Sequence, residues 1–152
     1  LAGEGGWSMQ RMDIDNLLGE IYRGRENYAR ARSFHDSALE LSAQLDDTFG
    51  RSWALRNVAL DVLANPRSNV GELEGCRTIL EESLEAARTA GQPENLMHSL
   101  RALLEWTIKY NPDELAGVRP LYDELLETAE KVDSRVFGDF CRAVSAQFLQ
   151  NK

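Results

Sequence analysis

The chain has 152 residues, of which 43% are hydrophobic and 28% are charged, so it is long enough and apolar enough to fold around a core. Lysine and arginine number 17 against 25 aspartate and glutamate residues, which gives a net charge of -8 at pH 7. This balance excludes a general electrostatic attraction to nucleic acid or to anionic lipid. No apolar run approaches the roughly 18 residues that a membrane span needs. We therefore predict neither a nucleic-acid nor a membrane partner.

The cysteines and histidines do not form a metal or redox motif. Cys76 and Cys141 lie far apart inside helical patterns, which indicates small buried side chains in a reducing cytoplasm rather than a disulfide. His35 and His98 have no cysteine or carboxylate set at ligand spacing, so no metal or other cofactor is predicted, and His35 is interpreted as a packing residue. The Gly-rich segment 1–7, which does not begin with Met, indicates a flexible linker remnant of a longer protein.

Seven segments have apolar residues at intervals of three and four, which predicts helices. Residues that cap or break helices bound them, such as Ser8 and Gly24 around the first and the loop 65–69 after the third. In chain order the predicted helices span 8–23, 27–45, 48–63, 70–89, 94–110, 113–132 and 134–149. Pro120 lies inside the sixth, where it removes a backbone donor and is expected to kink the helix. The predicted fold class is all-α, in a single domain over 8–152.

The helices repeat in pairs. Ala31 and Ala38 in the second helix match Cys76 and Ser83 in the fourth at a spacing of 45 residues, and the sixth helix continues the series. A helical hairpin of this size cannot bury its apolar face alone and stacks on its neighbours. The repeat therefore predicts an α-solenoid of about three antiparallel hairpins plus a closing helix.

The first hairpin has large and small residues at set positions, namely Leu18, Gly19, Tyr22, Tyr28, Ala31 and Ala38. In this it resembles the tetratricopeptide repeat family. The resemblance implies a right-handed superhelix in which Gly19 and Ala38 allow the paired helices to touch, with no chemistry of its own. Two phrases, ARARSFHDSALELSAQLDDTFGRSWALRNVAL and CRTILEESLEAARTAGQ, resemble repeats in large bacterial multidomain regulators, where such arrays bind proteins or peptides.

The candidate binding residues lie on the first helix of each hairpin, which in a solenoid usually lines the concave surface. Arg56 and Arg101 hold equivalent positions, Arg142 follows in the last helix, Asn16 takes the place of the arginine in the first helix, and Asn57 neighbours Arg56. One interpretation is an arginine ladder (Arg56, Arg101 and Arg142) that captures carboxylates or phosphates, such as an acidic peptide segment or a free C-terminus.

The alternative is that each arginine pairs with a nearby acid and remains solvated. Glu105 follows Arg101 by four residues and Asp139 precedes Arg142 by three, both at helix-pairing distance. Such exposed pairs contribute only about 0–1 kcal/mol to stability. For Arg56 the nearest acid, Asp61, is at a poorer spacing. Both interpretations stay open on the sequence.

Two interpretations are also open for the tryptophans. Trp53 and Trp106 lie on first helices of hairpins and are interpreted mainly as core residues, with an apolar floor for a ligand as the alternative. Trp7 is expected to cover an end of the array or a neighbouring molecule.

The predicted function is a non-catalytic protein or peptide interaction module in the cytoplasm. The alternative is self-association, as a homo-oligomer, through Trp7 or through the last helix with Val136, Phe137, Phe140 and Phe148. An enzyme is not predicted, because the sequence has no Gly-rich phosphate loop and no serine in a nucleophile setting.

Overall fold

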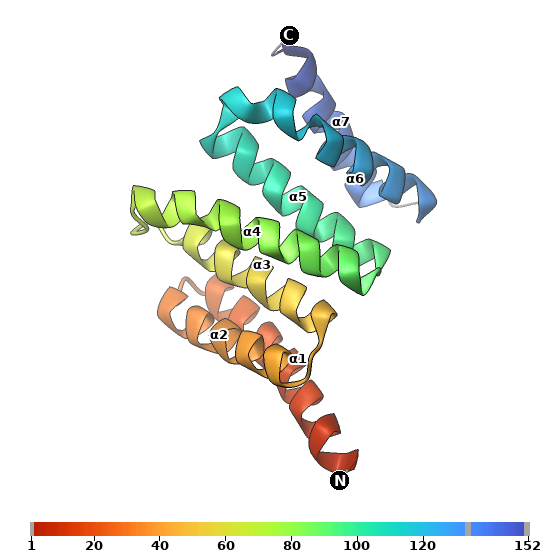
Figure 1. Cartoon of the computed structure of the whole chain (residues 1–152). Helices are drawn as coiled ribbons and strands as arrows, with labels where there is room; N and C mark the ends of the chain where they lie inside the picture. The colour runs from red at the N-terminus through yellow and green to blue at the C-terminus, as the bar shows by residue number, and fades with distance from the viewer. Residues whose placement is uncertain (1, 133–134, 151–152) are drawn as a thin grey trace. The chain divides into compact units, whose positions relative to one another are not determined.

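The computed structural model describes residues 2–132 and 135–150, and throughout these ranges the regular structure is helical, with no strand (Figure 1). The elements are α1 (Ala2–Gly24), α2 (Tyr28–Gln44), α3 (Thr48–Ala64), α4 (Val70–Ala90), α5 (Pro93–Tyr110), the 3-10 helix η1 (Pro112–Val118), α6 (Arg119–Lys131) and α7 (Arg135–Gln150). The predicted all-α class is confirmed. No helix in this part of the chain is both long and apolar enough to cross a membrane.

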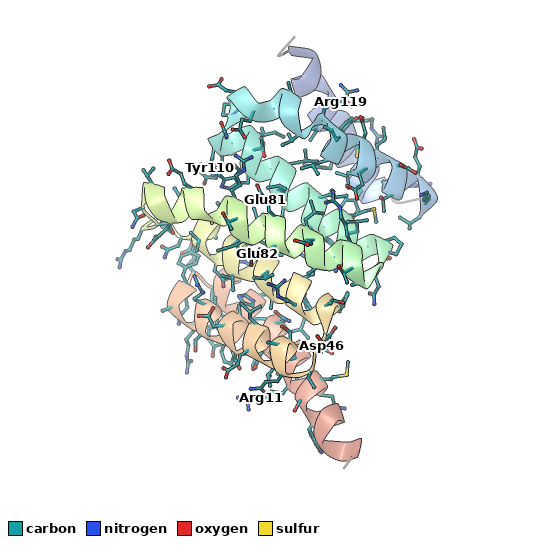
Figure 2. The ribbon with its side chains drawn as sticks, viewed as in Figure 1. Arg11, Asp46, Glu81, Glu82, Tyr110 and Arg119 are labelled. Atoms are coloured by element: carbon teal, nitrogen blue, oxygen red, sulfur yellow. The ribbon has the colours of Figure 1, made fainter. Side chains whose placement is uncertain are left out.

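The helices group into two compact units, Leu1–Ala90 and Gly91–Lys152. In the first unit α2 packs against α1 and α3, and α3 packs against α4. Polar side chains line the outside of this unit, and Figure 2 shows Glu81 and Glu82 projecting from α4. They pair with cations nearby, since Arg77 Nε lies 2.8 Å from Glu81 and Arg51 lies 3.5 Å from Glu82.

Short turns with specific caps separate the helices of the first unit. The Asn27 side chain accepts a hydrogen bond from the Arg30 amide at 3.3 Å, and the Asp47 side chain accepts one from the Gly50 amide at 3.1 Å. These bonds satisfy amides that the first turn of a helix leaves without an intrahelical partner. The breaks predicted before α2 and α3 therefore lie where the sequence placed them.

Asp13 on α1 lies near the capping carboxylate of Asp47. Burial and the negative charge of Asp47 both raise the pKa of Asp13 above the ordinary aspartate value. The folded state then holds the Asp13 proton more tightly than the unfolded state does, so stability falls as the pH rises through this raised pKa. We expect Asp13→Asn to stabilise the protein by roughly 0.2–0.5 kcal/mol at pH 7, a modest value because the side chain is exposed.

Urea unfolding at pH 7 and at pH 3 checks this expectation. The gain should vanish at pH 3, where the wild-type carboxyl is protonated as well. Glu85→Gln, which removes an exposed negative charge from α4, is the control and should show neither the gain nor its pH dependence. A gain of equal size at both pH values would contradict the electrostatic cause.

Helix α1 begins at Ala2 and so includes residues 2–7 of the segment expected to be a flexible lead. Ser8, predicted as the N-cap, lies inside the helix and is half-buried. Helix formation is cooperative, and each residue added to an existing helix gains a hydrogen bond. The packed turns downstream therefore extend the helix through glycines that would not start one alone.

The sixth predicted helix is divided. A 3-10 helix, Pro112–Val118, precedes α6, which begins at Arg119. Pro120 consequently lies in the first turn of α6 rather than within it, and the predicted kink inside a continuous helix is wrong. The first turn is the position where a proline costs nothing, because its missing amide would have no intrahelical partner there.

The second unit packs α5, α6 and α7 around an apolar interior. Tyr122 donates a hydrogen bond from its hydroxyl to the Cys141 carbonyl at 3.3 Å. The predicted burial of both cysteines is confirmed, and burial raises the pKa of Cys141 and that of Cys76, the latter to about 11. On α7, Phe137 is buried and Phe140 half-buried, whereas the side chains of Val136 and Phe148 lie outside the described residues.

Candidate functional site

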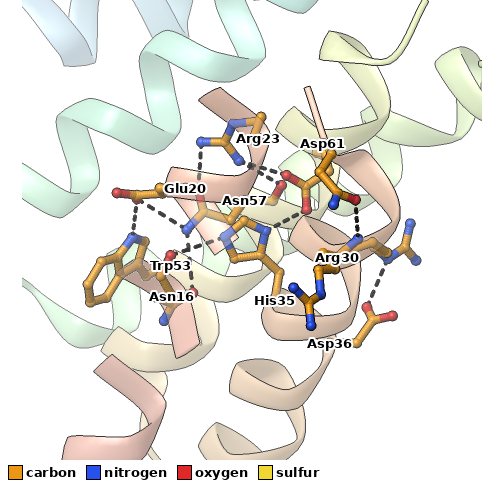
Figure 3. A network of polar contacts seen from close by, with 12 residues as sticks. Asn16, Glu20, Arg23, Arg30, His35, Asp36, Trp53, Asn57 and Asp61 are labelled. Atoms are coloured by element: carbon orange, nitrogen blue, oxygen red, sulfur yellow. Dashed lines mark hydrogen bonds and ion pairs between the residues drawn. The ribbon is translucent and has the colours of Figure 1, made fainter. Parts of the chain in front are cut away.

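A buried polar network joins α1, α2 and α3 (Figure 3). We use this name for the residues Asn16, Arg23, His35, Asn57 and Asp61. At its centre the His35 ring is fully buried, with Nδ1 2.5 Å from Asp61 Oδ2 and Nε2 3.2 Å from the Asn16 carbonyl oxygen. Both partners are acceptors, and each ring nitrogen lies within hydrogen-bond distance of one of them.

Arg23 completes the network from the end of α1. Its guanidinium donates to Asp61 Oδ1 at 2.9 Å, to Asn57 Oδ1 at 3.2 Å and to the Asn57 carbonyl at 3.4 Å. Each oxygen of the Asp61 carboxylate thus has its own nitrogen partner, from Arg23 or from His35, in a site where Asp61 is only 3% exposed. Paired buried charges of this kind are strongly directional, so the network sets how α3 lies against the α1–α2 hairpin.

A second group of side chains lies beside this network at the surface. Phe49, Trp53 and Arg56 follow one another on one face of α3 and are half-buried, as is Glu20 of α1. We call these four residues the Trp53 cluster. The Trp53 indole N–H donates to Glu20 Oε1 at 3.1 Å, and its ring lies 6.2 Å from that of Phe49.

The network holds the Trp53 cluster in place. Asn57 Nδ2 lies 3.4 Å from Glu20 Oε1, and the same amide group lies 3.4 Å from Asn16 Oδ1. Glu20 therefore receives donors from a buried amide and from the indole, which keeps the carboxylate and the Trp53 ring in one arrangement. The cluster combines an aromatic surface with charged groups on packed helices.

Arg56 supplies the cation of the cluster. Burial lowers its pKa to about 10, the Glu20 carboxylate opposes this shift, and the Arg23 charge adds to it. The guanidinium remains protonated at neutral pH. Because it has lost part of its hydration, a carboxylate that approaches it interacts more strongly than with a fully solvated arginine.

The structure places the other predicted site residues of the first unit in the interior. Asn16 is 0% and Asn57 2% exposed, and both belong to the buried network. Their side chains bridge α1 and α3 and do not reach the surface. Asp61, considered as a local partner of Arg56, instead binds Arg23 and His35.

Arg101 and Arg142 belong to the second unit. Arg101 pairs with Glu105 at 2.9 Å and lies over the Phe140 ring, 4.8 Å from its centroid. Arg142 pairs with Asp139, and both side chains are exposed. The two local pairs expected from the sequence are therefore formed.

Sequence reasoning missed the roles of Arg23, Asp61 and Glu20. One signal was present, since Asn57 and Asp61 are polar residues four apart on the buried face of α3. His35, interpreted as a packing residue, occupies a buried position between Ala31 and Ala38, so that interpretation is confirmed. Its charged partners come from distant segments and leave no local pattern.

A shallow hollow of about 570 Å³ opens between the α1–α2 turn and the α3–α4 loop, lined by residues that include Tyr28, Asn65 and Arg67. Nowhere in the described ranges do three His, Cys, Asp or Glu side chains gather in a group able to hold a metal ion. The chain matches no protein-family model, and no curated protein or solved structure is similar to it. The features of the structure that bear on function are therefore the Trp53 cluster and the surfaces of the helices.

Proposed function

We propose that this chain is a non-catalytic interaction module that binds a protein or peptide through the Trp53 cluster. The observation that carries the proposal is the juxtaposition of Trp53 and Arg56, both half-buried and held over a buried polar network. Tryptophan and arginine are the residues most often responsible for binding energy in protein interfaces. Side chains that are already ordered also lose less entropy on binding.

The charge of Arg56 indicates the chemistry of the partner. A guanidinium binds a carboxylate through two parallel hydrogen bonds, so an acidic segment or a free C-terminal carboxylate suits it best. The Trp53 ring beside it offers a flat apolar surface for a neighbouring side chain. We expect the partner to place a carboxylate on Arg56 and an apolar group on Trp53.

The proposal includes a tetratricopeptide-like array. The buried positions of α2 recur on α4 after 45 residues, with Ala31, His35, Ala38 and Ser42 matched by Cys76, Leu80, Ser83 and Ala87. This repeat supports stacked hairpins of one plan, as in a right-handed superhelix. Such an array would serve as the sensing or docking arm of a larger bacterial regulatory protein in the cytoplasm.

A peptide library tests the proposal. Random peptides of about twelve residues, each with a free or an amidated C-terminus, are selected on the chain, and the affinity of the best binders is measured by fluorescence anisotropy. We expect the selected peptides to be acidic and Arg56→Ala to weaken their binding at least tenfold, which corresponds to about 1.4 kcal/mol. Circular dichroism should show unchanged helix content.

Two further variants make the result specific. Arg32→Ala removes an exposed arginine that pairs with Asp36 on α2, and it should leave the affinity unchanged. The triple change of Arg56, Arg101 and Arg142 to alanine tests the arginine ladder, which predicts a larger loss than Arg56→Ala alone. Equal losses would confine the site to the Trp53 cluster, and no loss in either variant would contradict the proposal.

A further inference from the structure

The first helix carries an exposed apolar stripe. Trp7 is 74% exposed, Ile14 53%, Leu17 51% and Ile21 50%. Their spacings of seven, three and four residues place them along one side of α1, over about 21 Å of the helix axis. We call these four residues the α1 stripe. Among the described side chains the other large exposed hydrophobic residues are Met9 and Val70.

The two hairpins of the first unit share one internal geometry, which allows α1 to be aligned with α3. In the second hairpin Ser52 and Ser83 each donate a hydrogen bond to the other's carbonyl oxygen, at 3.0 and 2.8 Å. In the first hairpin Met12 and Ala38 belong to one buried cluster. A spacing of 40 residues between α1 and α3 places Met12 on Ser52, and a spacing of 45 residues between α2 and α4 places Ala38 on Ser83. With these two spacings the buried contact of the first hairpin coincides with that of the second.

On this alignment the α1 stripe corresponds to a buried surface. Residues 14, 17 and 21 of α1 match Ala54, Asn57 and Asp61 of α3, which are only 0, 2 and 3% exposed. The α1–α2 hairpin covers that surface of α3, where Arg23 binds both Asn57 and Asp61. The α1 stripe therefore corresponds to the surface of α3 on which the α1–α2 hairpin packs. On α1 this surface is exposed.

The composition of the α1 stripe indicates what occupies it. Leu17 and Ile21 stand where α3 has Asn57 and Asp61, so a hairpin that brought the equivalents of Arg23 and His35 would bury a guanidinium and an imidazole without acceptors. The occupant must instead present an apolar helix face. Within the described part of this chain the only such face is the α1 stripe itself.

We infer that two copies of this chain associate through their α1 helices, in a two-fold symmetric contact that places one α1 stripe on the other. Such an interface uses the same patch on both partners. An antiparallel pair centred between Ile14 and Leu17 brings Trp7 of each copy opposite Gly24 of the other. Gly24 has no side chain, and apart from its chain neighbours and the helix backbone no atom lies within 4 Å of a methyl group placed there, so the indole has room.

A lipid surface is a poorer match for the same stripe. Helices that lie on membranes carry lysine and arginine on their polar face. The exposed charged side chains that flank the stripe on α1 are instead one cation and one anion, Arg11 and Asp13, in a chain whose net charge is -8. The repulsion from anionic headgroups favours a second copy as the occupant.

Sedimentation equilibrium of the 152-residue chain tests the inference. The protein concentration runs from about 1 to about 200 μM, because dimers with interfaces of modest area dissociate in this range. We expect a monomer–dimer equilibrium. The double variant Leu17→Glu with Ile21→Glu should raise the dissociation constant at least 100-fold, while circular dichroism shows unchanged helix content, since both positions are half exposed and glutamate is a good helix former. Val70→Glu, which changes an exposed residue on α4, is the control and should leave the dimer intact.

A second measurement locates the contact. Ile14→Cys with Leu17→Cys should give a disulfide-linked dimer under mild oxidation, because the two-fold contact sets residue 14 opposite residue 17 of the other copy. A chain that stays monomeric at all concentrations would overturn the inference. A dimer that survives the glutamate variant, or binding of the monomer to anionic phosphatidylglycerol vesicles through the same residues, would overturn it as well.

Discussion

Replacing Asp61 with alanine is expected to lower the free energy of unfolding by about 3–5 kcal/mol, the range measured when one partner of a buried ion pair is removed. The Asp61 carboxylate lies 2.9 Å from the Arg23 guanidinium and 2.5 Å from His35 Nδ1, and its loss leaves both groups without this acceptor beside a His35 side chain that is 0% exposed. Urea unfolding followed by circular dichroism measures the change. The transition of the first unit should move to lower urea concentration.

Two controls separate charge from shape in this experiment. Asp61→Asn keeps the size of the side chain and removes the charge, so most of the loss should persist if the ion pairs are its cause. Asp36→Ala removes the acid of the exposed Arg32–Asp36 pair and should cost less than about 1 kcal/mol. A loss at Asp61 no larger than that at Asp36 would contradict the view that the network holds α3 in place.

Local signals account for most of what the sequence predicted correctly. The helix breaks before α4 and α5 follow from Pro66 and from the Gly91–Pro93 segment, since proline and glycine disfavour helix interiors wherever they occur. The pairs Arg101–Glu105 and Arg142–Asp139 are likewise determined by helix geometry alone. These predictions depend on a few neighbouring residues and carried over into the structure, whereas the N-cap predicted from local signals at Ser8 did not.

The error in the sixth predicted helix arose where two local solutions compete. Pro112 and Pro120 each suit the first turn of a helix, and the structure uses both by placing a 3-10 helix between them. Burial of Leu115, which is 2% exposed, holds this segment against the rest of the second unit. That packing depends on distant residues, so sequence periodicity could not choose between one kinked helix and two elements.

The candidate site was the hardest part to predict, because the residues that bond to one another across its three helices lie 19 to 41 positions apart in the sequence. The repeat position predicts Asn16 and Asn57 as surface ligands, yet both side chains face inward. Arg23 and Glu20 bond to Asn57, and the Asn57 amide in turn donates to Asn16 Oδ1. A buried polar side chain has no periodic signature of its own. Only the fold brings its partners to it.

Replacing Gly19 with alanine is expected to destabilise the chain by about 2–3 kcal/mol, through overpacking rather than through loss of a contact. A methyl group at Gly19 would lie 2.2 Å from His35 Nε2, far inside van der Waals contact. The ring cannot move aside at low cost, because its two nitrogens are held by Asp61 and by the Asn16 carbonyl. Thermal and urea unfolding measure the loss.

A glycine-to-alanine substitution at another position is expected to raise the stability, which separates overpacking at Gly19 from the effect of the substitution itself. Gly75 lies inside α4 with no atom within 4 Å of an added methyl group, so Gly75→Ala should stabilise by roughly 0.5–1 kcal/mol through helix propensity. Combining Gly19→Ala with His35→Ala completes a double-mutant cycle. In the absence of the ring, the alanine at 19 should cost nothing further. A cost that persists there would mean that Gly19 is required for its backbone and not for the space that His35 fills.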